Sequence, residues 1–300
     1  MCQIEEMSEQ IHQITLSDGR ALDVRDAGHE GGVPLVFHHG TPGSLAAIRA
    51  IDRSAEEHGF RILTASRAGY GGSSPHPGRR VADVVPDTEE LLDHLGIDRC
   101  VVAGWSGGGP HALACAARLD AAVGALVIAG VAPFDASGLS FLDGMGADNV
   151  EEFGAAVAGP EAIRTYLAAA SEELEDLTVE SMIASMDSLL PAADKAVLTQ
   201  EFGADMVAEF VEALRSGYEG WLEDDLAFCA PWGFALDEIT IPTAIWQGSE
   251  DLMVPFAHGQ WLAAQVPGTQ AHLLEGEGHL SIALGAIDAM FGELLEFATR

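Results

Sequence analysis

Residues 99–108, which read RCVVAGWSGG, decide the fold class of this chain. The first half is an apolar run with the length of a buried strand, and an Ala-rich, helix-like stretch follows from Pro110 to Leu119. Between them stands the pattern Gly-x-Ser-x-Gly, with its serine at Ser106. At a strand-to-helix turn, this pattern lifts a serine hydroxyl out of the sheet on a strained backbone and directs helix N–H groups toward developing negative charge. Elsewhere it is an ordinary glycine-rich turn, and this sequence has neither the Lys of a P-loop nor the full G-x-G-x-x-G of a dinucleotide site.

On both sides of this turn, strand-like apolar runs alternate with helix-like stretches. The strand-like runs lie near residues 34–40, 60–66, 99–106, 123–133, 241–248 and 270–276, after a hairpin around Ser17-Asp18-Gly19. The helix-like stretches lie near residues 46–58, 81–96, 110–119 and 256–265, with an amphipathic helix at the C-terminus. This alternation predicts an α/β fold in which a mostly parallel sheet is flanked by helices.

The alternation stops after residue 133 and resumes at residue 241. Residues 134–240, called the helical insertion below, are Ala-rich and helix-like without a convincing strand. We therefore expect a core made of residues 1–133 and 241–300, with the insertion as a helical cap over the site. The insertion holds 23 acidic and three basic residues, a net charge of −20 within the −33 of the whole chain. The simplest interpretation of that charge is a solvated helical surface.

The composition restricts the partners of the chain. Its 300 residues include 14 Lys and Arg against 47 Asp and Glu. This balance argues against nucleic acids and anionic membranes as partners, because binding to either rests on clustered basic side chains. The 48% content of hydrophobic residues argues against disorder. We expect a small-molecule substrate, and the sequence leaves open whether the chain forms a homo-oligomer.

Several features predict a cytoplasmic protein without metal or cofactor. The first ten residues, MCQIEEMSEQ, lack the basic start and apolar stretch of a signal peptide, and no apolar run is long enough to span a membrane. The cysteines are Cys2, Cys100, Cys115 and Cys229, which favour a reducing compartment over a disulfide framework. Neither the cysteines nor the histidines show metal-ligand spacing.

With the serine turn, three further segments resemble those of the α/β-hydrolase family, in the same order along the chain. They are His39-Gly40-Thr41-Pro42-Gly43, similar to the H-G-x-P oxyanion loop, GSEDLMVP at 248–255, similar to the acid loop, and GEGH at 276–279, similar to the histidine loop. The resemblance covers essentially the whole chain outside the insertion. It departs at Ser66, where the family's D-R-x-G-x-G-x-S segment carries an acid; we expect this change to alter loop hydrogen bonding rather than chemistry.

The resemblance implies a Ser-His-Asp triad. Ser106 would attack a substrate carbonyl, and His279 would take its proton and later return it to the leaving group. Asp251 would hold the imidazole in place. Glu250 is the alternative acid, although the offset to Val254-Pro255 favours Asp251.

The same resemblance implies the remaining site residues. The backbone N–H groups of Thr41 and Gly107 would bind the oxyanion, because Pro42 has no N–H to offer. Trp105 lies beside the nucleophile and is a candidate for substrate contact.

Other residues receive more ordinary interpretations. We expect His39 to support the oxyanion loop and His272 to lie within the last strand, and we expect packing or surface positions for His38, His94, His111 and His258. Of the aromatic residues Trp221, Phe228 and Trp232, at least two are expected to pack the insertion against the core. Any that line the pocket would favour an apolar acyl or leaving group.

These features predict a serine hydrolase that cleaves a carboxylic ester or related acyl bond of a small, neutral and partly apolar substrate. Alternatives within the family are a proline-releasing aminopeptidase, whose free amine an acidic cap could hold, a lactonase, a C–C-bond hydrolase and a perhydrolase. An alternative from another class is a non-catalytic small-molecule binding protein on the same fold. The charge of the insertion predicts that anionic substrates are disfavoured and that the pKa of His279 is raised.

Overall fold

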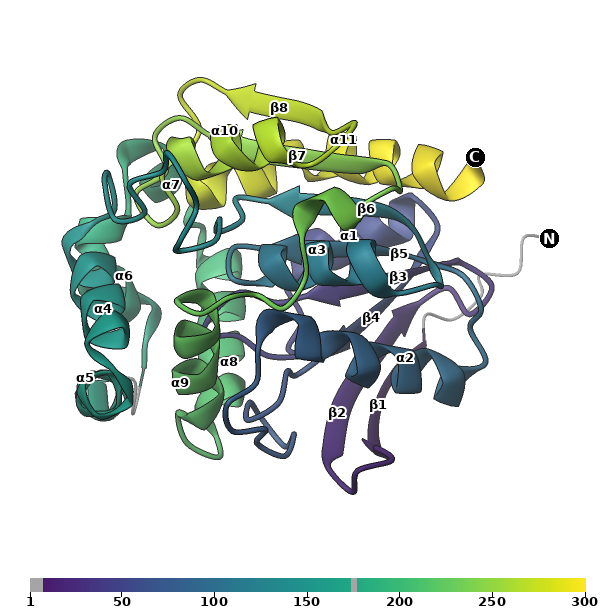
Figure 1. Ribbon diagram of the computed structural model, residues 1–300, viewed down its shortest axis with the longest axis horizontal. Coiled ribbons are helices and arrows are strands. Elements are labelled where there is room, and N and C mark those ends of the chain that lie inside the picture. The colour runs from purple at the N-terminus through teal and green to yellow at the C-terminus, as the bar shows by residue number, and fades with distance from the viewer. Residues whose placement is uncertain (1–7, 174–176) are drawn as a thin grey trace.

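The computed structural model describes residues 8–173 and 177–300 (Figure 1). Cys2 and most of the stretch in which the sequence predicts no signal peptide lie outside the described residues. An eight-stranded sheet runs through the described chain in the order β1-β2-β4-β3-β5-β6-β7-β8. The strands are β1 (Ser8–Thr15), β2 (Ala21–Gly28), β3 (Val33–His38), β4 (Phe60–Ala65), β5 (Cys100–Trp105), β6 (Ala122–Ile128), β7 (Thr243–Gly248) and β8 (Gln270–Leu274).

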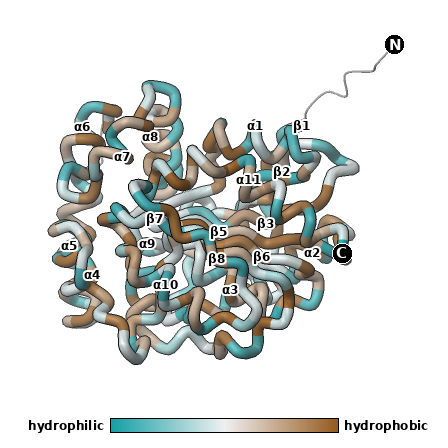
Figure 2. The backbone as a smooth tube through the Cα atoms, turned by 90° about the horizontal axis from the view of Figure 1, so that it is seen from above, coloured by the Kyte–Doolittle hydropathy of each residue, from teal (hydrophilic) through white to brown (hydrophobic). Residues whose placement is uncertain are grey.

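The sheet is mostly parallel, as the sequence predicts. β1 pairs with β2 and β2 with β4 in antiparallel fashion, and the other neighbours are parallel. The hairpin between β1 and β2 turns at Gly19, whose φ of +88° suits glycine. The central strands are apolar throughout because both of their faces are covered (Figure 2).

Helices cover the two faces of the sheet. α1 (Arg49–Glu57) and α11 (His279–Thr299) pack on one face, and α2 (Val84–Leu95), α3 (Gly108–Arg118) and α10 (Phe256–Gln265) pack on the other (Figure 1). Successive strand residues serve opposite faces: Leu35 and Phe37 belong to the first apolar cluster, and Val36 belongs to the second. These two clusters form the core around the sheet.

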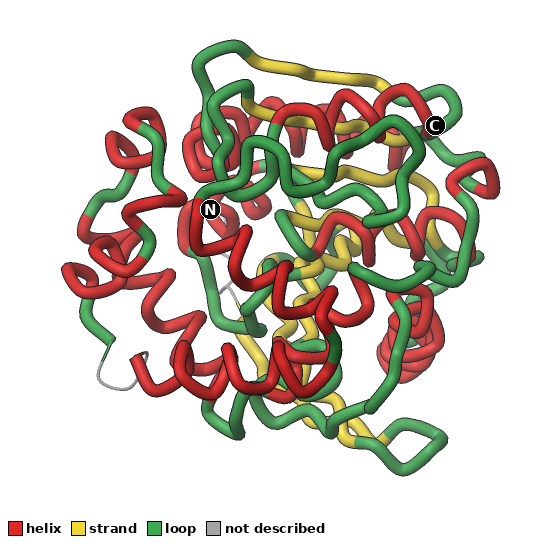
Figure 3. The backbone as a smooth tube through the Cα atoms, turned by 60° about the vertical axis from the view of Figure 1, so that its left-hand side comes forward, coloured by secondary structure: helices red, strands yellow, loops and turns green. Residues whose placement is uncertain are grey.

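The helical insertion leaves the sheet after β6 and returns to it at β7. Its helices are α4 (Ala147–Ala158), α5 (Pro160–Glu173), α6 (Val179–Ser185), α7 (Ala192–Val197), α8 (Gln200–Leu214) and α9 (Glu219–Phe228). Among its described residues there is no strand. Figure 3 brings this side forward, with helices and loops in front of the strands. In the described parts of the chain, no helix is long and apolar enough to cross a membrane.

The expectation that the acidic residues of the insertion form a solvated surface is wrong for six of them. The buried ones are Asp194, Asp205, Glu209, Glu223, Asp224 and Asp225. Several pair with basic side chains or backbone N–H groups of the rest of the chain, as Asp205 does with Arg49. A pattern of charge along a sequence does not reveal such partners, because they come from segments far away.

Candidate active site

The turn between β5 and α3 carries Ser106 on a strained backbone. Its backbone φ is +57°, a value that residues other than glycine rarely adopt. The glycines around it are required by close packing: a Cβ at Gly104 would overlap the Gly108 carbonyl oxygen, and a Cβ at Gly108 would overlap that of His38. The Ser106 backbone N–H donates to the Ile128 carbonyl at 2.8 Å, which fixes the turn against β6.

The loop after β3 lies directly against this turn. A Cβ at Gly40 would stand 3.7 Å from the Ser106 Cβ, and a Cβ at Gly107 would overlap the Thr41 side chain. The backbone N–H groups of Thr41 and Gly107 donate to no other protein group in the parts of the chain that the structure describes. They are therefore free to donate to a ligand oxygen beside Ser106.

His279 and Asp251 form a buried hydrogen-bonded pair. Nδ1 of His279 lies 2.8 Å from Oδ2 of Asp251. The same carboxylate accepts hydrogen bonds from the backbone N–H groups of Met253 and Val254, both at 2.8 Å, and from the side-chain amide of Gln247 at 2.9 Å. Such a carboxylate can hold one imidazole tautomer, with Nε2 left as the acceptor.

Glu250, the alternative acid, is exposed and contributes only its backbone N–H to the Glu277 carbonyl. His279 itself is the first residue of α11 rather than part of a free loop. The imidazole stacks on the Trp105 ring, with centroids 5.8 Å apart and planes at 25°. The His279 imidazole is therefore held by a hydrogen bond to Asp251 and by stacking on Trp105.

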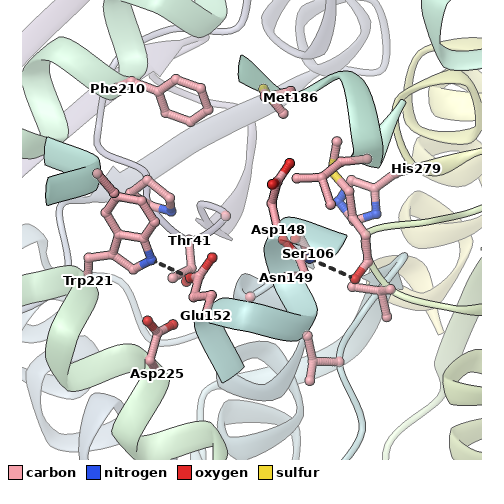
Figure 4. A pocket seen from close by; sticks show the side chains of 18 of the residues that line it. Thr41, Ser106, Asp148, Asn149, Glu152, Met186, Phe210, Trp221, Asp225 and His279 are labelled. Atoms are coloured by element: carbon pink, nitrogen blue, oxygen red, sulfur yellow. Dashed lines mark hydrogen bonds between the residues drawn. The ribbon is translucent and has the colours of Figure 1, made fainter. Parts of the chain in front are cut away.

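One cavity of about 250 Å³ brings these residues together. Ser106, His279 and Thr41 line it (Figure 4). Gly107 and Trp105 also belong to its lining. Within the described residues, the Ser106 hydroxyl makes no direct hydrogen bond to His279; such bonds are often loose in a free enzyme and tighten around a substrate. The arrangement can deliver a nucleophile, a base and two oxyanion donors to one carbonyl group.

The insertion contributes the rest of the cavity lining. Trp221 and Phe228 of α9 line it, whereas Trp232 lies outside it and stacks on Phe234. The expectation that at least two of these three aromatic residues pack the insertion against the core is confirmed, because Phe228 and Trp232 belong to the second apolar cluster around the sheet. Both Trp221 and Phe228 also pack in apolar clusters, so they serve both purposes.

Four carboxylates line the cavity: Asp148, Glu152, Glu209 and Asp225. No Lys or Arg does so among the described residues. Glu152 accepts a hydrogen bond from the Trp221 indole N–H at 2.6 Å (Figure 4), while both oxygens of the buried Asp225 carboxylate lack a donor. The cavity therefore favours a cationic or neutral ligand over an anionic one.

Burial changes the proton affinities of these carboxylates. It raises the pKa of Glu209 to about 8 and that of Glu152 to about 7. Burial and the nearby Glu152 raise the pKa of Asp225 well above its ordinary value. Near neutral pH, Glu152 and Asp225 therefore hold a proton between them, or would hold a cation in its place.

The pKa of His279 is raised above its ordinary value. Burial alone would lower it, but the negative charges of Asp251 and Asp194 and the hydrogen bond to Asp251 outweigh burial. The direction agrees with the sequence-based prediction, although the cause is two specific carboxylates rather than the general field of the insertion.

Asp224 of α9, another buried carboxylate of the insertion, holds the loop after β3 through hydrogen bonds. It accepts hydrogen bonds at 2.6 Å from Arg67 and Arg79 and at 2.8 Å from the Thr41 hydroxyl. Arg67 in turn donates to the carbonyls of His39 and Gly40 at 2.5 and 2.7 Å. Sequence reasoning missed Asp224, because nothing in its local sequence distinguishes it from Asp225.

Ser66 and the histidines other than His279 have the structural roles expected from the sequence. The Ser66 hydroxyl accepts a hydrogen bond from the Leu45 N–H at 3.0 Å, so this residue does serve loop bonding. His39 links Gly40 to Arg67 within the oxyanion loop, and His272 lies within β8. The remaining named histidines are buried (His38, His111 and His258) or exposed (His94). Across residues 8–173 and 177–300, no group of three or more His, Cys, Asp or Glu side chains could hold a metal ion.

Comparison with known proteins places these features in context. Residues 33–286 match the family described as alpha/beta hydrolase fold. The chain is 26% identical to a 2-hydroxy-6-oxononadienedioate/2-hydroxy-6-oxononatrienedioate hydrolase of Cupriavidus pinatubonensis, over 89% of this chain and 88% of that protein. It is 27% identical to a proline iminopeptidase of Neisseria gonorrhoeae, over 88% of both chains. An enol-lactonase of Burkholderia xenovorans has the same fold, with a TM-score of 0.68, 19% identity and coverage of 96% of this chain and 100% of that one.

Proposed function

The chain belongs to the alpha/beta hydrolase fold family, and from this premise we propose that it is a serine hydrolase that cleaves a carboxylic ester or related acyl bond. Ser106 attacks the carbonyl, His279 accepts the hydroxyl proton and gives it to the leaving group, and the departure of that group leaves the acyl group on Ser106. Water, which gives a proton to His279, then attacks this acyl-enzyme and releases the carboxylic acid and free Ser106. The observation that carries the proposal is the 2.8 Å bond between His279 and Asp251, on a cavity that Ser106 also lines.

We propose that the oxyanion is held by the backbone N–H groups of Thr41 and Gly107. Removing one such donor typically lowers the rate by about 10²–10³. We propose further that the insertion acts as the cap of this site. Support for that role comes from the cavity, since residues of α4, α5, α6, α8 and α9 line it together with Ser106 and His279.

The substrate we propose is small, partly apolar and neutral or cationic. A cavity of about 250 Å³ limits its size, and Trp105, Trp221 and Phe228 provide apolar surface. The relative from Cupriavidus is named for a dicarboxylate substrate. Such a dianion would meet Asp148, Glu152, Glu209 and Asp225 without a basic partner, so we do not extend that substrate class to this chain.

A direct test uses p-nitrophenyl acetate and a fluorophosphonate probe. We expect turnover of the ester and labelling of Ser106, and we expect Ser106→Ala to abolish both while the fold is retained. Wild-type protein with neither turnover nor labelling would instead support the alternative, a non-catalytic small-molecule binding protein.

A second candidate function is an aminopeptidase of the proline-releasing type, and one observation favours it. The Glu152–Asp225 pair could exchange its shared proton for the free amine of a substrate. Comparison of proline arylamide with the matching acyl ester and a lactone tests this candidate. Preference for the arylamide, lost in Asp225→Asn, would support it; faster cleavage of the ester would support the first proposal.

A cytoplasmic location also stays a proposal. Its support is that Cys100, Cys115 and Cys229, the cysteines within the described residues, form no disulfide with one another. Fractionation of the source cells would test it.

A further inference from the structure

A carboxylate of the insertion holds the backbone of His279. Asp194, in α7, accepts hydrogen bonds from the backbone N–H groups of His279, Leu280 and Ser281 at 2.9, 2.9 and 2.8 Å. Asp194 is fully buried. A Cβ at Gly278 would overlap the Asp194 carboxylate, so the close approach depends on a glycine at that position.

These bonds replace a missing helix cap. The first N–H groups of a helix have no partner within it and are usually satisfied by the side chain of the preceding residue. In α11 that residue is Gly278, which has no side chain to accept them. Asp194 accepts three of them from another helix, some 85 residues away in sequence.

The same bonds have an electrostatic consequence for His279. A helix N-terminus carries partial positive charge, which disfavours protonation of an imidazole placed there. The Asp194 carboxylate opposes that charge at the residue where the imidazole is attached. The groups that face His279 are Asp251 from the loop after β7, Asp194 from α7 and the uncharged ring of Trp105 from β5, while Glu209 of α8 lines the same cavity.

We propose that Asp194 is a positioning residue for His279: it fixes the backbone that carries the imidazole and compensates the positive end of α11. The proposal rests on the proposed role of His279 as the base. It also makes the position of the base depend on the docking of the insertion against α11.

The main test is the pH profile of kcat/KM for a neutral p-nitrophenyl ester. Asp194→Asn is compared with Asp187→Asn, which removes the same charge from an exposed position on the insertion, where Asp187 pairs only with Lys195. For Asp194→Asn we expect kcat to fall by about tenfold with little change in KM, because the base is no longer held. We expect the acidic limb to move by about half a unit to lower pH, because an opposite charge near the imidazole is lost. Asp187→Asn should leave the limb in place.

The pH position of the acidic limb of kcat/KM decides whether the proposal stands. A shift in Asp194→Asn that Asp187→Asn does not share supports the proposal. An unshifted limb, or an equal shift in both variants, overturns it, whatever happens to kcat. Ser106→Ala tests the proposed function separately from the role of Asp194. Activity retained in Ser106→Ala would overturn the proposed function together with this inference. An unshifted acidic limb in Asp194→Asn would overturn only the role of Asp194.

A second pair of variants keeps Asp194 itself intact, in case Asp194→Asn does not fold. Gly278→Ala pushes the carboxylate away from the helix end, and Gly285→Ala makes the same change on the same helix where the added methyl meets open space. We expect Gly278→Ala to lower kcat and to shift the acidic limb to lower pH, with Gly285→Ala unchanged. A Gly278→Ala enzyme with the wild-type limb would overturn the proposal.

Discussion

Two adjacent aspartates on α9 should respond to the same substitution in opposite ways. Asp224 is fully buried and accepts hydrogen bonds from Arg67, Arg79, Tyr70 and Thr41. Asp225 is equally buried, but its carboxylate oxygens have no donor and face a second carboxylate. Replacement of each by Asn, which has nearly the same shape, isolates the effect of charge.

The magnitude for Asp224→Asn follows from what it leaves behind. Loss of this carboxylate leaves the buried guanidinium groups of Arg67 and Arg79 without the acceptor that they share, and removal of one member of a buried ion pair costs about 3–5 kcal/mol. In a chain of this size, about 2–4 °C of melting temperature is lost per kcal/mol, so we expect a decrease of roughly 10 °C. Activity should fall as well, because the Thr41 hydroxyl loses its acceptor.

Asp225→Asn should leave the free energy of unfolding unchanged or raise it by about 1 kcal/mol, since it removes a charge that burial disfavours. Urea-induced and thermal unfolding at pH 7 measure both variants, and Glu238→Gln, at an exposed pair with Arg118, provides a control whose stability should stay close to that of the wild type. Equal losses in Asp224→Asn and Asp225→Asn would refute the reasoning, and so would a loss below about 1 kcal/mol in Asp224→Asn.

Four further predictions concern the pH dependence of activity, the pH dependence of stability, the turn at Ser106 and the charge of the substrate. Because the pKa of His279 is raised and the base must be neutral, kcat/KM should reach half its maximum above pH 6.5, and a midpoint below 6 would contradict this assignment. The raised pKa values of Glu152 and Glu209 mean that the folded chain binds more protons than the unfolded chain between about pH 4.5 and 8. The contribution of these groups to stability should therefore decrease as pH rises through that window. Urea unfolding at pH 5.5 and 8 checks this, because the decrease should be smaller in Glu209→Gln than in wild type. Ser106→Gly should be more stable than Ser106→Ala by about 0.5–1 kcal/mol, because only glycine adopts the φ of +57° without strain; equal melting temperatures would argue against strain at this turn. Anionic esters should show lower kcat/KM than neutral esters of equal length, and if the effect reflects approach to the acidic insertion it should weaken as salt rises; equal rates at low salt would count against it.

The sequence predicts most of the fold because its signals are local. The apolar runs at β5 and β6, the glycines around Ser106 and the alternation of strands and helices all reflect contacts that a short segment makes with a covered sheet. Errors at the ends were small: the helix expected from residue 46 begins at Arg49, and α3 begins at Gly108 rather than at Pro110.

The site was predictable where motifs carry it and unpredictable where distant segments meet. The residues proposed for catalysis each follow a strand of the core, as motif reasoning anticipates. Asp194 and Asp224 do not, because their partners are backbone N–H groups and arginines some 85 and 157 positions away. Their acidic surroundings look like surface in the sequence, although both side chains are buried.

The central claim is that acyl transfer runs through Ser106. Rapid quenching of the reaction with p-nitrophenyl acetate, followed by peptide mass mapping, tests it most directly. The account predicts an acetyl group on the peptide that contains Ser106, formed during a burst of p-nitrophenol and absent when Ser106 is replaced by Ala. Acetyl transfer to another residue, or undiminished turnover in Ser106→Ala, would contradict the account.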